Sequence, residues 1–463
     1  MRWSKNGHLV FDMLKSLIRR FIPESVISVY HYLLARVAAV VYGNPSQQLI
    51  VIGVTGTNGK SSTVQFIGRL LESLGERIGW TTTIGFKIAQ SEWTNDQKMT
   101  MLGRFQTQRF LRKMVTAGCR YAIVETSSQG ITQSRHVGIA YDVGVFTNLT
   151  PEHIEAHGGF EAYKEAKGKL FATLARLPVK VLDGKEIKKV TVVNARDAFA
   201  EYFLSFGAGE SWRFGWRQKR EAEEVWEAGE VWATDVVFSA QGTTFQIEGI
   251  AFTFKPMGRF NFENVLAAIA TSCALGFSLE QMRDSVASLS GVPGRLERIH
   301  EGQPFEVIVD YAPEPAALAA TYEAISLLPY TRLIHVLGST GGGRDVSRRA
   351  VLGEMAAKKS DIMIVTNEDP YDDDPMEIIN QIADAAVACG KKDHENLFRI
   401  VDRMEAIQKA MRVAESGDLI LITGKGCEPV MAVAHGKKIP WDDRQAVRQI
   451  LQTYETAIRT QTS

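Results

Sequence analysis

The sequence contains little cysteine and no excess of either charge. Its four cysteines, Cys119, Cys273, Cys389 and Cys427, lie too far apart for the ligand pairs of a zinc site or for a disulfide framework. Sparse cysteine is typical of a reducing compartment, so we expect a cytoplasmic protein. Lys+Arg and Asp+Glu both total 53, so no overall field favours nucleic acid, and any anion-binding site must be local.

Long hydrophobic runs are also missing. Residues 14–42 are apolar at helical spacing, but Arg19, Arg20, Glu24 and Arg36 interrupt them. No window reaches the roughly 18–20 apolar residues that a membrane span requires, and no small-residue cleavage site marks an export signal. We expect a helix that packs on the next domain or, as the alternative, lies on a membrane surface as a peripheral contact.

The apolar segments that are present predict an α/β protein with a doubly wound central domain. Buried strands alternate with amphipathic helices, which is typical of a mostly parallel sheet covered on both faces. The predicted strands lie at 49–55, 121–125 and 143–147, and the predicted helices at 61–74, 159–174 and 261–275. Residues 212–255 alternate polar and bulky side chains and predict an antiparallel β excursion from this domain.

A second alternating series predicts a smaller, Rossmann-like C-terminal domain. Its strands are expected at 306–311, 333–337, 361–365 and 419–423. The chain as a whole is thus predicted to contain a short leader at 1–48, a central ATP-binding domain at 49–292 and a C-terminal domain at 293–463.

The clearest local signal is a glycine-rich loop, TGTNGKSS, at residues 55–62 between a predicted strand and a predicted helix. Small residues there let backbone N–H groups turn toward phosphate, and the helix N-terminus adds positive potential. The strict pattern G-x-x-x-x-G-K-[ST] is not met, because Val54 replaces its first glycine. The loop still predicts a P-loop ATPase domain, with nucleotide contacts from Thr57, Asn58, Gly59, Lys60, Ser61 and Ser62.

The loop is similar to that of the Mur ligases and the folylpolyglutamate synthetases, and other motifs extend the likeness. VETSSQG at 124–130, followed by QSR at 133–135, resembles a segment of the MurE branch, the tripeptide synthetases, as does FTNLTPEH at 146–153. Further matching segments are YKEAK at 163–167, GRFN at 258–261, GVPGR at 291–295, VDYA at 309–312 and GKGCE at 424–428. The resemblance implies an enzyme that activates a carboxylate with ATP and traps the acyl-phosphate with an amine.

The resemblance also implies roles for individual residues. Lys60, Glu125, His153 and Lys167 would be catalytic. Ser61, Glu125 and His153 would hold magnesium ions, supported by a carbamylated Lys167. Asn264 would contact the adenine, Asp310 the ribose and Arg295 the phosphates. The substrates would meet Ser127, Gln133, Arg135, Glu368, Asp369, Tyr371, Gly424 and Glu428.

The chain departs from the MurE pattern at several positions. A typical member carries a UDP-binding domain before its phosphate loop, whereas only 48 residues precede Leu49 here, so the resemblance is to an enzyme with a shortened N-terminal domain. Cys427 and Gln129 replace histidines, and Pro313-Glu314 replaces His-Thr.

A further departure concerns the incoming amino acid. Tyr371 stands where diaminopimelate-adding members carry an arginine, and residues 372–374 are all aspartate. This acidity favours a distal ammonium, as in lysine or ornithine, near Glu368 and Asp369. Alternatively, the aspartates only cap the helix that begins near Pro375.

Together these features favour a monomeric ligase that takes ATP, Mg²⁺, an amino acid and a muramoyl-peptide precursor of the cell wall. Two alternatives remain at this point. One is the same chemistry on a folate-like or poly-amino-acid acceptor, and the other is a non-catalytic nucleotide-binding subunit.

Overall fold

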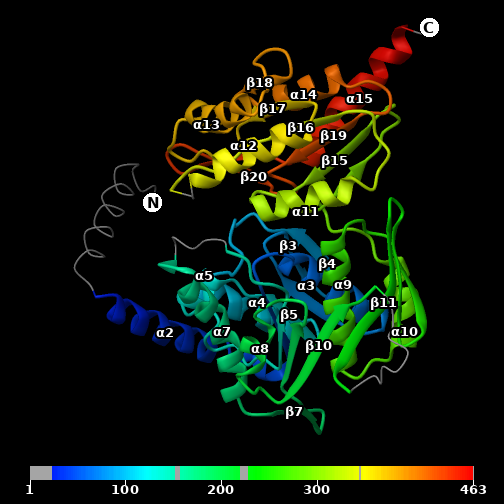
Figure 1. Ribbon diagram of the computed structural model, residues 1–463. Helices are drawn as coiled ribbons and strands as arrows, with labels where there is room; N and C mark the ends of the chain where they lie inside the picture. The colour runs from blue at the N-terminus through cyan, green and yellow to red at the C-terminus, as the bar shows by residue number, and fades with distance from the viewer. Residues whose placement is uncertain (1–22, 152–156, 219–227, 344–345, 462–463) are drawn as a thin grey trace.

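The computed structural model describes residues 23–151, 157–218, 228–343 and 346–461. Figure 1 shows two sheets, one above the other, each with helices packed against it. The larger sheet belongs to the central part of the chain and the smaller sheet to the C-terminal part. This arrangement confirms the predicted α/β fold class.

The larger sheet has 11 strands in the order β13-β12-β11-β10-β9-β6-β1-β5-β2-β3-β4. Its centre is parallel, because β1 pairs in parallel with both β5 and β6. The strands are β1 (Ile50–Thr55), β2 (Ile78–Thr81), β3 (Gly85–Ile88), β4 (Ser91–Thr94), β5 (Tyr121–Glu125), β6 (Val143–Phe146), β9 (Val190–Asn194), β10 (Glu210–Trp216), β11 (Glu230–Ser239), β12 (Gly242–Ile247) and β13 (Ile250–Phe254). All six residues of β1 are buried, as expected for a strand covered on both faces.

Helices cover both faces of this sheet and form a separate apolar core on each. One core includes Phe66 of α3 and Leu266 of α9, and the other includes Leu111 of α4 and Phe171 of α7. The helices are α3 (Lys60–Ser73), α4 (Arg104–Thr116), α5 (Ser128–Thr132), α7 (Phe160–Arg176), α8 (Ala200–Leu204), α9 (Arg259–Ala274) and α10 (Leu279–Ser288). A small hairpin joins β7 (Lys180–Leu182) to β8 (Lys185–Ile187).

The β excursion is only partly antiparallel, which corrects the sequence-based prediction. Strand β10 pairs in parallel with β9 and with β11, and only β11, β12 and β13 run antiparallel to one another. Alternation of polar and apolar side chains reports which face of a strand is buried, but it carries no information on the direction of the neighbouring strand.

The smaller sheet has six strands in the order β14-β15-β19-β16-β17-β18 and is parallel except for β14. Its strands are β14 (Glu297–Ile299), β15 (Glu306–Asp310), β16 (Leu333–Leu337), β17 (Ile362–Thr366), β18 (Leu397–Ile400) and β19 (Leu419–Thr423). The helices are α11 (Pro315–Ile325), α12 (Ser347–Lys359), α13 (Pro375–Ala388), α14 (Arg403–Val413) and α15 (Asp443–Gln461), and β20 (Val430–Val433) pairs with β21 (Lys437–Pro440). The antiparallel edge strand β14 was not expected from the sequence, because it is only three residues long.

Before the central sheet, helix α2 (Glu24–Val41) packs against α4 and leads into the short 3₁₀ helix η1 (Pro45–Gln48). Ala35, Ala38 and Ala39 form its buried side, while Leu33 and Val37 are more than half exposed. Residues 14–22 of the apolar segment lie outside the described residues. Within the described part of the chain, no helix is long and apolar enough to cross a membrane.

Candidate active site

The glycine-rich loop turns from β1 into α3 at the centre of the larger sheet. Gly59 precedes the helix with a φ of 80°, and a Cβ there would lie 2.1 Å from Oδ1 of Asn264. A Cβ on Gly56 would lie 1.9 Å from Oγ1 of Thr147. Glycine is therefore required at both positions, by backbone conformation at Gly59 and by close packing at each.

Two lysines converge on one carbonyl group of this loop. Nζ of Lys60 donates to the carbonyl oxygens of Gly56, at 3.1 Å, and of Thr57, at 2.6 Å. Lys167 reaches the same Gly56 oxygen from α7, at 2.6 Å, and its side chain lies 4.3 Å from the centre of the Tyr163 ring. Two lysine side chains from different helices therefore lie at the loop, and Lys60 gives it a local positive charge although the chain as a whole has none in excess.

The other residues of the loop are held by a neighbouring strand end. The backbone N–H of Asn58 donates to Oδ1 of Asn148 at 2.8 Å, and Oγ1 of Thr147 donates to the carbonyl oxygen of Asn58 at 2.7 Å. Thr57 bonds Thr150 through its hydroxyl, and Ser62 is buried in the first turn of α3. These contacts hold the loop in this conformation.

Ser61 and Glu125 form the part of the site that fits a magnesium ion. Oγ of Ser61 donates to Oε2 of Glu125 at 2.7 Å, and Glu125 also accepts from the backbone N–H and hydroxyl of Thr83. Magnesium in nucleotide sites prefers oxygen ligands and takes one or two carboxylates together with phosphate and water. The described residues contain no cluster of three His, Cys, Asp or Glu side chains.

His153, expected as a second magnesium ligand, lies outside the described residues. The nearby His157 lies with its ring 5.1 Å from that of Tyr163. Burial lowers the pKa of His157, and Lys167 and Lys169 lower it further. His157 therefore packs against Tyr163.

The three residues expected to meet the nucleotide from farther along the chain are placed differently. Asn264 lies against the loop, where its Oδ1 accepts from the hydroxyl of Thr63 at 3.2 Å. The guanidinium of Arg295 lies over the Tyr311 ring at 4.3 Å, and its Nε is buried without a hydrogen-bond partner among the described residues. Asp310 is buried, and burial raises its pKa; its carboxylate accepts from the hydroxyl of Thr321 at 2.5 Å. The ribose contact of Asp310 therefore stays a prediction.

The residues expected to hold the acceptor gather around α5. Ser127 caps this helix through the backbone N–H of Gly130, and Arg135 donates to Oε1 of Gln133 at 2.6 Å. Arg135 also donates to the carbonyl oxygen of Met101. This links α5 to the loop that precedes α4.

The residues of the C-terminal domain that are expected to meet the incoming amino acid lie in a dense cluster of charged side chains. Asp369 accepts from Lys425 and from Lys98, and Lys425 also pairs with Glu428. Burial raises the pKa of Asp369, but the two lysines outweigh it and hold the pKa below its ordinary value. Glu368 is buried, its pKa is raised by burial, and its Oε2 would lie 2.6 Å from a Cβ on Gly424.

The substrate contact expected for Asp369 stays a prediction, because its carboxylate is paired with two of the chain's own lysines. A substrate ammonium would reach its carboxylate only by displacing one of the chain's own lysines. Lys98 and Lys425 were not singled out from the sequence. Lys425 carried a signal, since it lies within the matched GKGCE segment, whereas Lys98 lies in an unremarkable loop.

The aspartates after Pro370 serve local structure. Asp374 caps α13 by accepting from the backbone N–H of Met376 at 2.9 Å, which confirms the capping alternative for this residue. Asp373 accepts from Gly342, and Asp372 from the backbone N–H of His435. Tyr371 has a φ of 53°, a left-handed conformation that few bulky residues adopt.

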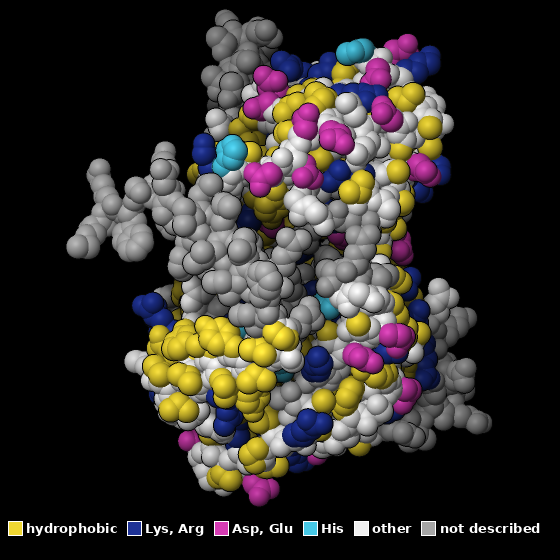
Figure 2. Space-filling view, turned by 90° about the vertical axis from the view of Figure 1, so that its left-hand side faces the viewer, with side chains coloured by type: hydrophobic (Ala, Val, Ile, Leu, Met, Phe, Trp, Pro, Cys, Tyr) yellow, Lys and Arg dark blue, Asp and Glu magenta, His cyan; other side chains and the backbone are white. Residues whose placement is uncertain are grey.

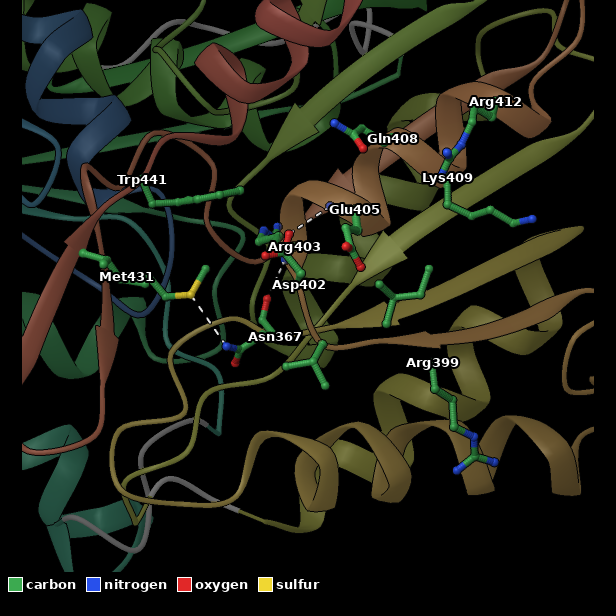
Figure 3. A pocket seen from close by; sticks show the side chains of 13 residues that line it. Asn367, Arg399, Asp402, Arg403, Glu405, Gln408, Lys409, Arg412, Met431 and Trp441 are labelled. Carbon is green, nitrogen blue, oxygen red and sulfur yellow. Dashed lines mark hydrogen bonds between the residues drawn. The ribbon is translucent and has the colours of Figure 1, made fainter.

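A pocket of about 850 Å³ lies at the carboxyl ends of β17 and β18, beyond Asn367 (Figure 3). Lys409 and Arg412 of α14 line it together with Trp441. Arg399 is paired with Asp384 and Asp393, and Arg403 with Asp443, so these cations are already neutralised. None of the residues predicted for the site lines this pocket.

The fold and the site define a nucleotide-binding α/β enzyme with a phosphate loop in one domain and a charged second site in the other. Residues 54–272 match the Mur ligase middle domain, and residues 294–426 match the Mur ligase, glutamate ligase domain. The chain therefore belongs to the Mur ligase family of ATP-dependent ligases.

Individual relatives agree with this assignment. The chain is 37% identical to a UDP-N-acetylmuramyl-tripeptide synthetase of Roseiflexus sp. (strain RS-1), over 90% of this chain and 81% of that protein. It is 33% identical to a UDP-N-acetylmuramoyl-L-alanyl-D-glutamate–2,6-diaminopimelate ligase of Geobacillus kaustophilus (strain HTA426), over 92% of this chain and 84% of that protein.

Solved structures show the same likeness. A UDP-N-acetylmuramoyl-L-alanyl-D-glutamate–2,6-diaminopimelate ligase is 28% identical with a TM-score of 0.57, covering 88% of this chain and 79% of that one. A folylpolyglutamate synthase of Mycobacterium tuberculosis has a TM-score of 0.63 at 18% identity, covering 86% of this chain and 96% of that one. The second likeness concerns the fold alone.

Proposed function

We propose that this protein joins an amino acid to a muramoyl-peptide precursor of the cell wall, with ATP converted to ADP and phosphate. The observation that carries the proposal is the convergence of Lys60 and Lys167 on the phosphate loop, beside the Ser61–Glu125 pair. The names of the relatives supply the acceptor class, since they act on UDP-linked muramoyl peptides.

The chemistry requires two anions to meet. A carboxylate oxygen of the acceptor attacks the γ-phosphorus of ATP, ADP leaves, and the amine of the amino acid then displaces phosphate from the acyl-phosphate carbon. Lys60 would offset the phosphate charge during the first step, in a site preorganised by the loop contacts. A magnesium ion held by Ser61 and Glu125, together with His153, would supply further neutralisation when bound.

We further propose that Lys167 is carbamylated. The modification would turn a buried cation into an anion able to support the magnesium ion. Burial of this side chain, at 1% exposed, and its position beside the loop support the proposal. Tyr163 flanks it, and Tyr163 also bonds the hydroxyl of Thr57 at 3.3 Å.

We also propose a monomer that works in the cytoplasm and contacts an anionic membrane surface through α2. Residues of both domains from one chain contribute to the site, so no second copy is needed to complete it. Free cysteines, all four without a disulfide, fit a reducing compartment.

Figure 2 shows hydrophobic side chains gathered over the face of the lower domain on which α2 lies.

The exposed stripe of α2 is the observation that supports this contact. It repeats at helical spacing, and its residues are 48–65% exposed: Val26, Val29, Tyr30, Tyr32, Leu33, Val37, Val40 and Val41. The neighbouring helix α4 has three arginines and a lysine and no acidic residue. Apolar side chains flanked by cations are suited to the surface of an anionic bilayer.

Lys60→Ala tests the proposed activity. We expect ADP release in the presence of acceptor and amino acid to fall by about a hundredfold or more, because the phosphate charge is no longer offset. The exposed Lys169 on α7 provides the matched control, and Lys169→Ala should retain activity. Near-normal ADP release by a folded Lys60→Ala protein would contradict the proposal.

A further inference from the structure

Two arginines of the central domain meet at the start of α4. Arg104 is the first residue of this helix and donates to the backbone carbonyl oxygen of Gln133. Arg135 donates to the side-chain oxygen of the same Gln133 at 2.6 Å. It also donates to the carbonyl oxygen of Met101 and lies 3.8 Å from Sδ of Met99. All of these partners are neutral groups, so none of them balances the charge of either guanidinium.

The two charges have no counterion in the part of the chain that the structure describes. No carboxylate there pairs with Arg104 or Arg135, and Nε of Arg104 is buried without a hydrogen-bond partner. Burial lowers the pKa of Arg104 below its ordinary value, and the charge of Arg135 lowers it further. Burial also lowers the pKa of Arg135. Two partly buried like charges are unfavourable, and an anion beside them would offset both the burial and the repulsion.

The start of α4 favours an anion at the same place. Gly103 precedes the helix and has no side chain to accept a hydrogen bond from the first N–H groups, and the first turn contains no acidic residue. The N–H groups at the start of a helix have no partner within the helix and carry a partial positive charge. The helix start and both guanidinium groups therefore favour the same sign of ligand.

A short series of contacts connects the arginines with the proposed magnesium site. Arg135 bonds the carbonyl oxygen of Met101, and the hydroxyl of the preceding Thr100 accepts from that of Thr83 at 3.0 Å. Thr83 in turn donates to both carboxylate oxygens of Glu125, at 2.7 and 3.0 Å. The proposed acceptor carries anionic groups besides the carboxylate that reacts. Its glutamate has a second carboxylate, and its UDP has a diphosphate.

We propose that Arg104 is a further acceptor-binding residue, which together with Arg135 holds a second anionic group of the acceptor, a carboxylate or a phosphate. The inference rests on the proposed function and deepens it. Arg135 was expected to meet a substrate, whereas Arg104 lies outside every motif noted in the sequence. Paired guanidinium groups suit either anion, because their forked donors form charge-assisted hydrogen bonds with two oxygens at once.

Calorimetry with the full-length protein and a non-hydrolysable ATP analogue measures the Kd of UDP-muramoyl-dipeptide directly. We expect Arg104→Met to raise this Kd by about tenfold to hundredfold, the range of one charge-assisted hydrogen bond, and to leave the Kd of the ATP analogue unchanged. Arg104→Lys keeps the charge and should recover part of the loss. Arg176→Met, at an exposed arginine in the last turn of α7, is the control and should bind as the wild type does.

Two acceptor analogues identify the anionic group. One is muramoyl-dipeptide without UDP, and the other carries an amide in place of the carboxylate that does not react. If the amide analogue removes the effect of Arg104→Met, the group is the carboxylate. If the analogue without UDP removes it, the group is the diphosphate. An effect that neither analogue removes would show that Arg104 only supports α5, and an unchanged Kd in Arg104→Met would exclude the contact, so either result would overturn the inference.

The binding measurement also separates this inference from the proposed function. The fitted stoichiometry reports the fraction of folded protein, so a less stable variant is not mistaken for one of lower affinity. A wild type that binds the acceptor through Arg104 but forms no product would refute the proposed function and leave the inference standing. A wild type that binds none of the acceptors would overturn the inference.

Discussion

Lys167 is a buried lysine whose environment decides its chemistry. Its ammonium touches a backbone carbonyl and an aromatic face beside the phosphate loop, and the side chain is 1% exposed. If it is carbamylated, Lys167→Ala removes an anion from the site. We expect this variant to lose activity and to regain part of it with a short carboxylate such as acetate.

Two further measurements make the prediction for Lys167 specific. Lys169→Ala, on the exposed side of the same helix, should neither lose activity nor respond to acetate. An intact-mass spectrum taken without acid should show the added carbamate on the wild type. Unmodified lysine at full occupancy, or a variant that acetate does not rescue, would count against carbamylation.

The residues of the phosphate loop could be predicted because they are contiguous in the sequence. Their spacing alone predicts a turn, the start of a helix and the position of the phosphate-binding lysine. Lys98 could not be predicted in this way, because its partner Asp369 lies 271 positions along the chain. Glu368 and Asp369 were expected as an acidic pair, but charge in a sequence does not reveal which cations fold against it.

Helix α2 has a face of apolar side chains that stays exposed to solvent. We expect the protein to float with vesicles that contain phosphatidylglycerol and to float weakly with pure phosphatidylcholine. Leu33→Glu with Val37→Glu should lower binding by about tenfold or more, because each buried apolar side chain contributes roughly 1.5–3 kcal/mol. These two residues are 56% and 52% exposed, so the changes leave the core intact.

Val181→Glu with Val237→Glu provides a control of equal charge, since these valines are 63% and 60% exposed on other elements. Equal flotation of all three proteins would exclude a membrane contact through α2. A change in oligomeric mass in the α2 variant would instead indicate that a second copy covers this face.

Strand β16 contains a buried histidine whose titration affects stability. His335 lies between the hydroxyl of Tyr322, at 2.9 Å, and that of Thr423, at 3.0 Å, and burial lowers its pKa to about 3. The folded protein keeps it neutral while the unfolded chain protonates it near its ordinary pKa of about 6.5. The contribution of His335 to the free energy of unfolding is therefore fully present above pH 6.5 and is lost as the pH falls toward 3.

Chemical denaturation between pH 7 and 4 measures this effect. The slope attributable to His335 should approach, but not exceed, roughly 1.4 kcal/mol per pH unit, and His335→Gln should remove it. His435→Gln, at an exposed histidine, is the control and should leave the slope unchanged. An unaltered slope in His335→Gln would show that other groups dominate the acid dependence.

At the scale of elements, the sequence predicted the strands around the phosphate loop well and the β excursion poorly. The predicted helix at 61–74 is observed at Lys60–Ser73, because a glycine loop marks its start. The parallel pairing of β10 with β9 and β11 could not be foreseen, since strand direction depends on the path of the chain between strands.

The whole molecule combines a phosphate loop in one domain with a cluster of charged side chains around Asp369 in the other. Lys98 crosses between them, and the loop that carries it bonds Thr83, which in turn bonds Glu125.

The central claim is that the protein forms an amide bond to a muramoyl peptide at the expense of ATP. The most direct test is the product mass after purified protein is incubated with ATP, Mg²⁺, UDP-muramoyl-dipeptide and a mixture of amino acids. We predict one new species, heavier than the acceptor by an amino acid less water, with ADP in equal amount and neither product with Lys60→Ala. ATP turnover without a new mass, or an unchanged acceptor and no ADP across all amino acids, would contradict the account.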